Sequence, residues 1–140
     1  MSSSDPLRGV LPSSLTPFDA DGRVDFDAFD RHVARMVQAR VGGVIVASTL
    51  GEAGSLSPDE RLELVRRAAA RTRPGGVPTS AAAVGYGVAQ DRRYLGALRR
   101  HGADAVLLFP PVLYRPSADE FVAHLERSIE LAGLPTLVFN

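Results

Sequence analysis

Short apolar runs alternate with segments of helical periodicity along the whole chain, and this alternation restricts the fold more than any other feature of the sequence. The runs begin near Gly9, Gly43, Pro78, Ala105 and Pro135. Their spacing of about 30 residues is the size of one βα unit. The pattern predicts a parallel α/β fold, and the absence of a Pro/Gly/Ser-rich linker predicts a single domain over residues 1–140.

Four helices are expected between these runs, because helix start and stop signals stand at suitable positions. Two segments carry a capping box, in which a serine and a glutamate three residues later satisfy each other's backbone groups. Glycine is suited to end a helix because it adopts left-handed backbone angles without strain. The first helix is expected to start at Asp25 and end at Gly42, and the second starts with the capping box of Ser57 and Glu60. The third is expected over residues 88–100, before Gly102. The fourth starts with the capping box of Ser117 and Glu120 and ends at Gly133.

Two architectures satisfy repeated βα units, an open doubly wound sheet and the front part of an eight-stranded (β/α)8 barrel. The chain has 140 residues, whereas a complete barrel has about 250, so length favours the open sheet. No glycine-rich phosphate loop of either common type follows any run, so the nucleotide sites of doubly wound sheets are missing. In both folds, ligands bind beyond the carboxyl ends of the strands.

Charge and residue counts exclude several classes of function. The 16 basic residues equal the 16 acidic ones in number, so no basic field favours nucleic acid or an anionic membrane. Without cysteine, the chain has no disulfide, thiolate metal site or cysteine nucleophile, which fits a cytoplasmic protein. We expect no metal site, because His32, His101 and His124 lie on separate predicted helices without an HExxH pattern. No leader segment or membrane span is expected.

The basic residues are all arginine, because the sequence contains no lysine. A mechanism that forms an imine requires an amine that loses its proton before it attacks a carbonyl group. Arginine does not replace lysine in this role, because its guanidinium stays protonated. The 140 residues alone therefore offer no side chain that forms an imine.

Residues 48–52, with the sequence Ser-Thr-Leu-Gly-Glu, are the best candidate for a small-anion site. Hydroxyl groups and backbone N–H groups at the end of a strand hold a carboxylate, and Gly51 allows its close approach. The alternative is that these hydroxyls and Glu52 only satisfy backbone groups in a βα turn.

Four groups of short motifs follow one another along the chain. The first group is Leu-Thr-Pro-Phe at 15–18 with Asp-Gly-Arg-Val-Asp at 21–25, and the second is Ser-Thr-Leu-Gly-Glu at 48–52 with Leu-Ser-Pro-Asp-Glu-Arg at 56–61. The third is Gly-Ala-Asp-Ala-Val-Leu at 102–107 with Pro-Pro at 110–111 and Arg-Pro-Ser at 115–117. The fourth is Leu-Val-Phe-Asn at 137–140. In order and spacing they resemble the dihydrodipicolinate synthase and N-acetylneuraminate lyase family, the pyruvate-dependent class I aldolases. The resemblance covers nearly the whole chain.

The resemblance implies a (β/α)8 barrel, of which this chain is the front part with about five strands and four helices. In this family a lysine on the sixth strand forms an imine with pyruvate or a related 2-oxo acid, and no cofactor is needed. The resemblance implies that Thr49 is catalytic and that Ser48, Thr49 and Leu50 bind substrate. Leu50 stands where a second threonine is usual, and Phe139 stands at the position of a proton-relaying tyrosine.

The same resemblance bears on one further position, whereas Tyr86 stands out only by its place at the end of a run. Leu113 replaces a tyrosine that the synthases contribute across a dimer, although Tyr114 is adjacent to it. Tyr86, at the end of the third run, faces a substrate or packs within its loop. Members of the family are oligomers, so a homo-oligomer or association through exposed sheet edges is expected.

Three hypotheses remain open at this point. The first is a Schiff-base aldolase or lyase of which this chain is the front part, truncated before the lysine and inactive alone. The second is a non-catalytic, truncated or degenerate half-barrel that acts as an assembly partner. The third is a self-contained five-stranded doubly wound domain with a small-anion site at Ser48 and Thr49.

Overall fold

The structure, a computed structural model, describes residues 7–84, 88–111 and 115–139, and it alternates helices with short strands. The helices are α1 (Phe26–Gln38), α2 (Pro58–Thr72), α3 (Val88–Leu98) and α4 (Ala118–Ala132). The strands are β1 (Val44–Val46), β2 (Thr79–Ala83), β3 (Ala105–Leu108) and β4 (Thr136–Val138). Three single turns of 3-10 helix are η1 (Ala53–Ser55), η2 (Arg73–Gly75) and η3 (Arg99–His101). The predicted alternation of strands and helices is confirmed.

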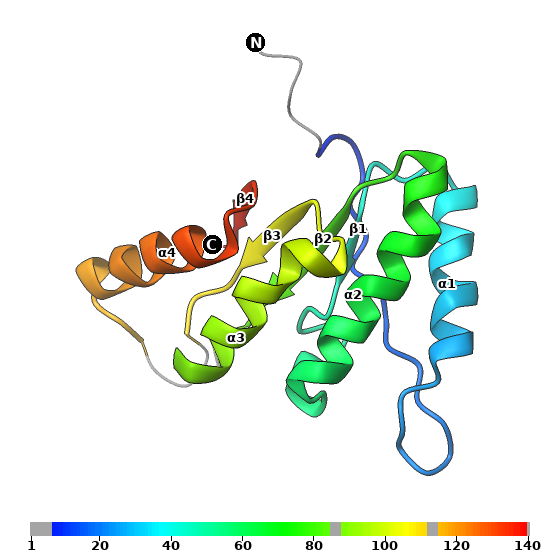
Figure 1. Cartoon of the computed structure of the whole chain (residues 1–140), viewed down its shortest axis with the longest axis horizontal. Coiled ribbons are helices and arrows are strands. Elements are labelled where there is room, and N and C mark those ends of the chain that lie inside the picture. Colours follow the sequence, from blue (N-terminus) through cyan, green and yellow to red (C-terminus); the bar gives the residue numbers. More distant parts are fainter. Residues whose placement is uncertain (1–6, 85–87, 112–114, 140) are drawn as a thin grey trace.

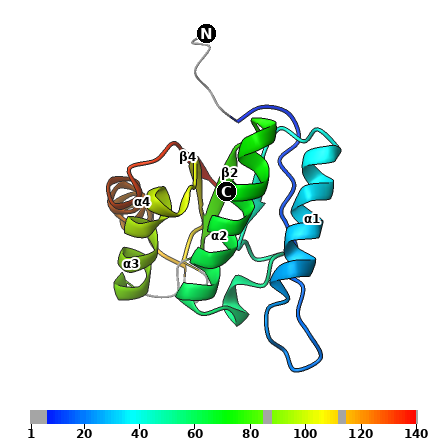
Figure 2. The same cartoon turned by 45° about the vertical axis from the view of Figure 1, so that its right-hand side comes forward.

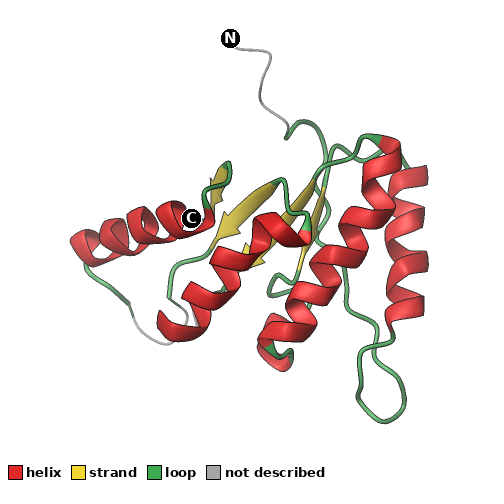
Figure 3. Ribbon diagram, in the orientation of Figure 1, coloured by secondary structure: helices red, strands yellow, loops and turns green. Residues whose placement is uncertain are grey.

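All four strands are parallel and follow one another in the order β1-β2-β3-β4 (Figure 1). The helices lie together on one side of this sheet (Figures 2 and 3). Right-handed crossovers that always step in the same direction place every helix on the same face, as in a barrel. A doubly wound sheet reverses direction once and carries helices on both faces. The fold is therefore part of a (β/α)8 barrel, and the doubly wound alternative is wrong.

The main core fills the space between the helices and the sheet. Its side chains come from the strand residues that face the helices and from the inner faces of α1, α2, α3 and α4. Central members are Phe29, Val33, Val65, Leu98 and Val106, each completely buried. The other face of the sheet carries a second, smaller cluster, which no α-helix of the described residues covers. Its members are Ala53, Ala82, Val84 and Phe109. This face corresponds to the interior of a barrel.

The run that begins near Gly9 does not form the expected first strand. It joins the sheet through one parallel bridge, in which Ile45 N–H donates to Pro12 O at 2.9 Å and Ser14 N–H donates to Ile45 O at 2.8 Å. Pro12 has no N–H with which to extend this ladder toward residue 43. Ala47, with φ of 55°, leaves the extended conformation just beyond Ile45. The described residues therefore form four strands and a bridged segment instead of five strands.

The helix boundaries follow the predicted signals except at the end of α1. Both capping boxes are present, at Ser57 before α2 and at Ser117 before α4. Gly102 and Gly133 take positive φ angles of 93° and 56° after η3 and α4, as expected. Helix α1 ends at Gln38 and not at Gly42. Gly42 instead allows close chain approach, since a Cβ atom there would lie 1.6 Å from the carbonyl oxygen of residue 8.

An ion-pair network joins α1 to α2. Glu63 accepts hydrogen bonds from Arg66 at 2.6 and 2.7 Å and from Arg67 at 2.9 Å. Asp30 of α1 in turn accepts hydrogen bonds from Arg67 at 3.1 Å and from Arg71 at 2.9 Å. The hydrogen bonds and positive charges of Arg66 and Arg67 lower the pKa of Glu63 from 4.5 to about 2. This network connects two helices that pack side by side (Figure 1).

The lowered pKa of Glu63 predicts an acid-sensitive contribution to stability. Because the folded-state pKa lies below the unfolded one, the contribution is complete above about pH 4.5 and declines as the pH falls toward 2. We expect the difference in melting temperature between wild type and Glu63→Gln to shrink over this interval in thermal melts followed by circular dichroism. Glu130→Gln, at an exposed site on α4, is the control. A difference that stays constant from pH 7 to 2.5 would contradict this account.

Candidate functional site

The segment after β1 forms a compact turn at the carboxyl end of the sheet. Two backbone hydrogen bonds close it, from Glu52 N–H to Thr49 O and from Ala53 N–H to Ser48 O, both 3.1 Å long. Ala47 and Glu52 bracket the turn with φ angles of 55° and 56°. Non-glycine residues in this left-handed region are uncommon and gather at functional sites. The predicted site segment therefore has a defined and unusual backbone.

Ser48 holds this turn to the segment before α1. Its side chain is buried, and its hydroxyl forms a short hydrogen bond with the hydroxyl of Ser13. The Ser48 oxygen also accepts a hydrogen bond of 3.4 Å from Gly51 N–H. The Ser48 hydroxyl is thus engaged within the protein. Its predicted role in substrate binding stays a prediction, and in this structure the hydroxyl holds the turn against residue 13.

Gly51 lies against the same neighbouring segment. A Cβ atom at this position would lie 2.8 Å from Ser14 O, closer than real Cβ atoms approach an oxygen. Thr16 donates a hydrogen bond of 2.7 Å from its hydroxyl to Gly51 O. Gly51 therefore allows a close approach of the chain to itself, and the predicted approach of a carboxylate to Gly51 stays a prediction.

Thr49 and Leu50 are predicted site residues whose side chains reach the surface. Both are exposed, Leu50 by 69 % of its area. Within the described residues, no hydrogen bond to the Thr49 hydroxyl is found, in contrast to the hydroxyls of Ser48 and Thr16. Thr49 therefore presents a hydroxyl group at the carboxyl edge of the sheet, where barrel enzymes bind their substrates.

Phe139 lies at the carboxyl end of β4, where its ring stacks on that of Phe109 at the end of β3. The ring centroids are 4.6 Å apart and the planes differ by 20°. Phe139 N–H donates to Leu108 O at 2.8 Å, and Phe109 N–H donates to Ala83 O at 3.1 Å, so both backbones are fixed to neighbouring strands. Sequence reasoning missed Phe109, although it follows its apolar run as Phe139 follows the next one.

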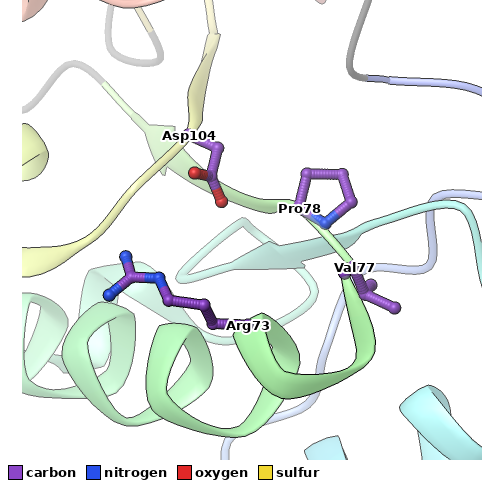
Figure 4. A pocket seen from close by; sticks show the side chains of 5 residues that line it. Arg73, Val77, Pro78 and Asp104 are labelled. Atoms are coloured by element: carbon purple, nitrogen blue, oxygen red, sulfur yellow. The ribbon is translucent and has the colours of Figure 1, made fainter.

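The opposite edge of the sheet carries a different feature, a cavity of about 330 Å³ (Figure 4). Its lining includes Arg73, Val77, Pro78 and Asp104 and none of the predicted site residues. Asp104 has a structural partner there, since its carboxylate accepts a hydrogen bond of 2.9 Å from Thr79 N–H. Residues at this end of a barrel typically contribute to stability and not to catalysis.

Four residues named in the sequence analysis cannot be placed in the structure. Tyr86, Leu113, Tyr114 and Asn140 lie outside the described residues. Among the residues that are described, no group of three or more histidine, aspartate or glutamate side chains is arranged to hold a metal ion. No helix in the described ranges is long and apolar enough to cross a membrane.

Comparison of the sequence with curated proteins finds relatives that match along nearly all of this chain. It is 39 % identical over 133 residues to a probable 5-dehydro-4-deoxyglucarate dehydratase of Streptomyces avermitilis, covering 95 % of this chain and 40 % of the relative. It is 35 % identical over 137 residues to a 4-hydroxy-tetrahydrodipicolinate synthase of Phenylobacterium zucineum, covering 97 % of this chain and 46 % of the relative. The chain thus spans less than half the length of these relatives.

Solved structures also match nearly all of this chain and less than half of their own length. A dihydrodipicolinate synthase from Bacillus clausii superposes with a TM-score of 0.82 at 28 % identity, over 90 % of this chain and 42 % of that one. The synthase from Cyanidioschyzon merolae superposes with a TM-score of 0.91 at 23 % identity, over 96 % of this chain and 46 % of that one. The model of the dihydrodipicolinate synthetase family matches residues 6–140. The chain therefore belongs to the dihydrodipicolinate synthetase family, and it spans the front part of that family's barrel.

Proposed function

We propose that this chain supplies the carboxylate-binding part of a Schiff-base-forming aldolase or lyase that acts on pyruvate or a related 2-oxo acid. The observation that carries the proposal is the turn of residues 48–52, which presents the Thr49 hydroxyl at the carboxyl edge of the sheet. Membership of the family supports the same function. One solved relative, the prophage protein YagE of Escherichia coli, was crystallised in complex with pyruvate.

In the proposed site, the substrate carboxylate accepts hydrogen bonds from the Thr49 hydroxyl and from backbone N–H groups of the turn. Hydrogen bonds to a charged acceptor are roughly twice as strong as neutral ones. Ser48 and Gly51 contribute indirectly, because their contacts with residues 13–16 hold the turn in place. The bound carboxylate orients the adjacent 2-oxo group toward the barrel interior, and the Thr49 hydroxyl relays a proton.

In this proposal the lysine whose amine attacks the 2-oxo group lies outside this sequence, because the sequence contains no lysine. Attack by a neutral amine forms a carbinolamine, and loss of water gives the imine. Leu50 and Phe139 bring no hydroxyl group to the proposed site. Removing a positioned acid or base typically costs about 10²–10⁴ in rate. These two positions favour an aldolase, lyase or hydratase reaction over that of the synthases.

The proposal includes association with further protein and a cytoplasmic location. Strand β4 stands at the end of the sheet, and one face of the sheet has no helical cover in the described residues. Uncovered strand edges favour pairing with another chain. We propose a homo-oligomer or association through these edges. The absence of cysteine supports a reducing compartment.

Binding of pyruvate to the purified chain tests the role of the turn. We expect Thr49→Val to weaken binding at least about tenfold in a ligand-observed NMR titration, because one hydrogen bond to a charged group is lost. Thr49→Ser keeps the hydroxyl and is expected to retain most of the affinity. Equal affinity of wild type and Thr49→Val would contradict the proposed role. Circular dichroism of both variants controls for folding.

A further inference from the structure

The face of the sheet that no α-helix of the described residues covers ends in aromatic side chains at its carboxyl edge. Side chains alternate along a strand, so residues two apart share a face. Phe109 follows Leu107 on this face. Phe109 belongs to the smaller cluster and Leu107 packs against it, whereas Val106 and Leu108 point to the helices. Leu137 pairs with Leu107, and Phe139 stacks on Phe109. Both aromatic rings therefore lie on the face that corresponds to the barrel interior.

The aromatic pair is continuous with the proposed carboxylate site. Ala53 directly follows the turn of residues 48–52 and is buried in the same cluster as Val84 and Phe109. The cluster therefore links the end of the turn to the end of β3, and the stacked ring of Phe139 extends it to β4. The carboxyl edge of the sheet therefore carries hydrogen-bond donors at the turn of residues 48–52 and an apolar surface at Phe109 and Phe139.

The two residues differ in exposure. Phe109 is 8 % exposed, whereas Phe139 is 53 % exposed. The pair is nearly parallel, with planes 20° apart. A third planar group can extend such a stack, since aromatic pairs gain energy beyond the burial of their area.

Resting on the proposed function, we propose that Phe139 is a specificity-determining residue that selects a 2-oxo acid carrying a planar apolar group, such as an aryl substituent. The carboxylate of this substrate binds the turn at Thr49 while its planar group stacks on Phe139. A hydroxylated chain at the same place loses hydrogen bonds to water and gains none from the phenyl rings. The surface therefore disfavours sugar acids with several hydroxyl groups.

Phenylpyruvate and pyruvate are suitable probes, because they share the 2-oxo acid and differ in one aryl group. In ligand-observed NMR titrations with the full chain, we expect phenylpyruvate to bind at least about tenfold more tightly than pyruvate. Saturation transfer is expected to be strongest at the phenyl protons. Phe139→Ala and Phe139→Leu are expected to reduce the preference to about twofold, and the leucine variant keeps an apolar side chain that preserves folding.

Val122→Ala is the matched control, since Val122 is also an exposed apolar residue but lies on α4. The inference is overturned if phenylpyruvate binds no more tightly than pyruvate, does not bind, or keeps its preference in both Phe139 variants. The Thr49→Val variant distinguishes failure of this inference from failure of the proposed function. If Thr49→Val weakens pyruvate binding but no aryl preference exists, only the inference fails. If Thr49→Val changes neither ligand's affinity, the proposed function fails.

Discussion

Gly51→Ala is expected to destabilise the protein by about 2 kcal/mol, the middle of the range for an overpacked buried site. The new Cβ atom would lie 2.8 Å from Ser14 O, and that oxygen belongs to the backbone, which does not rotate away as a side chain does. Relief requires the turn to separate from residues 13–16. The hydrogen bond from Thr16 to Gly51 O is expected to weaken as a result.

Gly96→Ala is the matched control for this substitution. Gly96 lies in α3, is exposed, and has no heavy atom within 4 Å of an added Cβ. Alanine in a helix interior is more favourable than glycine by about 0.5–1 kcal/mol, so this variant is expected to be stabilised. Urea unfolding followed by circular dichroism measures both changes. Equal stability of Gly51→Ala and wild type would show that the turn is not held against residues 13–16.

The second large effect is expected on catalysis by a completed barrel. Such a barrel requires this chain together with the part of the Streptomyces avermitilis relative that lies beyond the matched region. Imine formation makes the methyl protons of pyruvate exchange with solvent deuterium, and this exchange is measured by NMR without knowledge of the second substrate. Thr49→Val is expected to slow the exchange by about 10²–10⁴, because a positioned proton relay is lost.

Thr49→Ser, which keeps a hydroxyl group, is the control for this measurement. It is expected to retain exchange within about tenfold of the wild-type barrel. An exchange rate of Thr49→Val close to that of wild type would assign proton relay to another group. The same barrel with Gly96→Ala controls for effects of substitution on assembly.

Local signals in the sequence predicted much of the fold. The capping boxes at Ser57 and Ser117 set the starts of α2 and α4, and Gly102 and Gly133 mark helix ends with positive φ angles. These signals work because the partners are three or four residues apart, so their chemistry is contained in a short segment. The choice between a doubly wound sheet and a barrel could not be made from such local signals. The side of the sheet on which each helix packs decides it.

The candidate site likewise has local features, which the sequence predicted, and long-range contacts, which it did not. The sequence predicted a turn at residues 48–52, which the structure contains, whereas the predicted approach of a carboxylate to Gly51 stays a prediction. It did not predict that the Ser48 hydroxyl is engaged by Ser13, which lies 35 residues away along the chain. It also missed the stack of Phe109 on Phe139, because this contact depends on the pairing of β3 with β4. Long-range pairing is not contained in any one motif.

Borohydride trapping tests the central claim most directly. Pyruvate is added to this chain alone, to the remaining part of the relative alone, and to both together, and the mass of each intact polypeptide is measured after reduction. Because the chain contains no lysine, we predict an adduct on the added polypeptide when both are present, and none on a side chain of this one. An adduct mapped to a side chain of this protein, or trapping that is unchanged by its presence, would contradict the account.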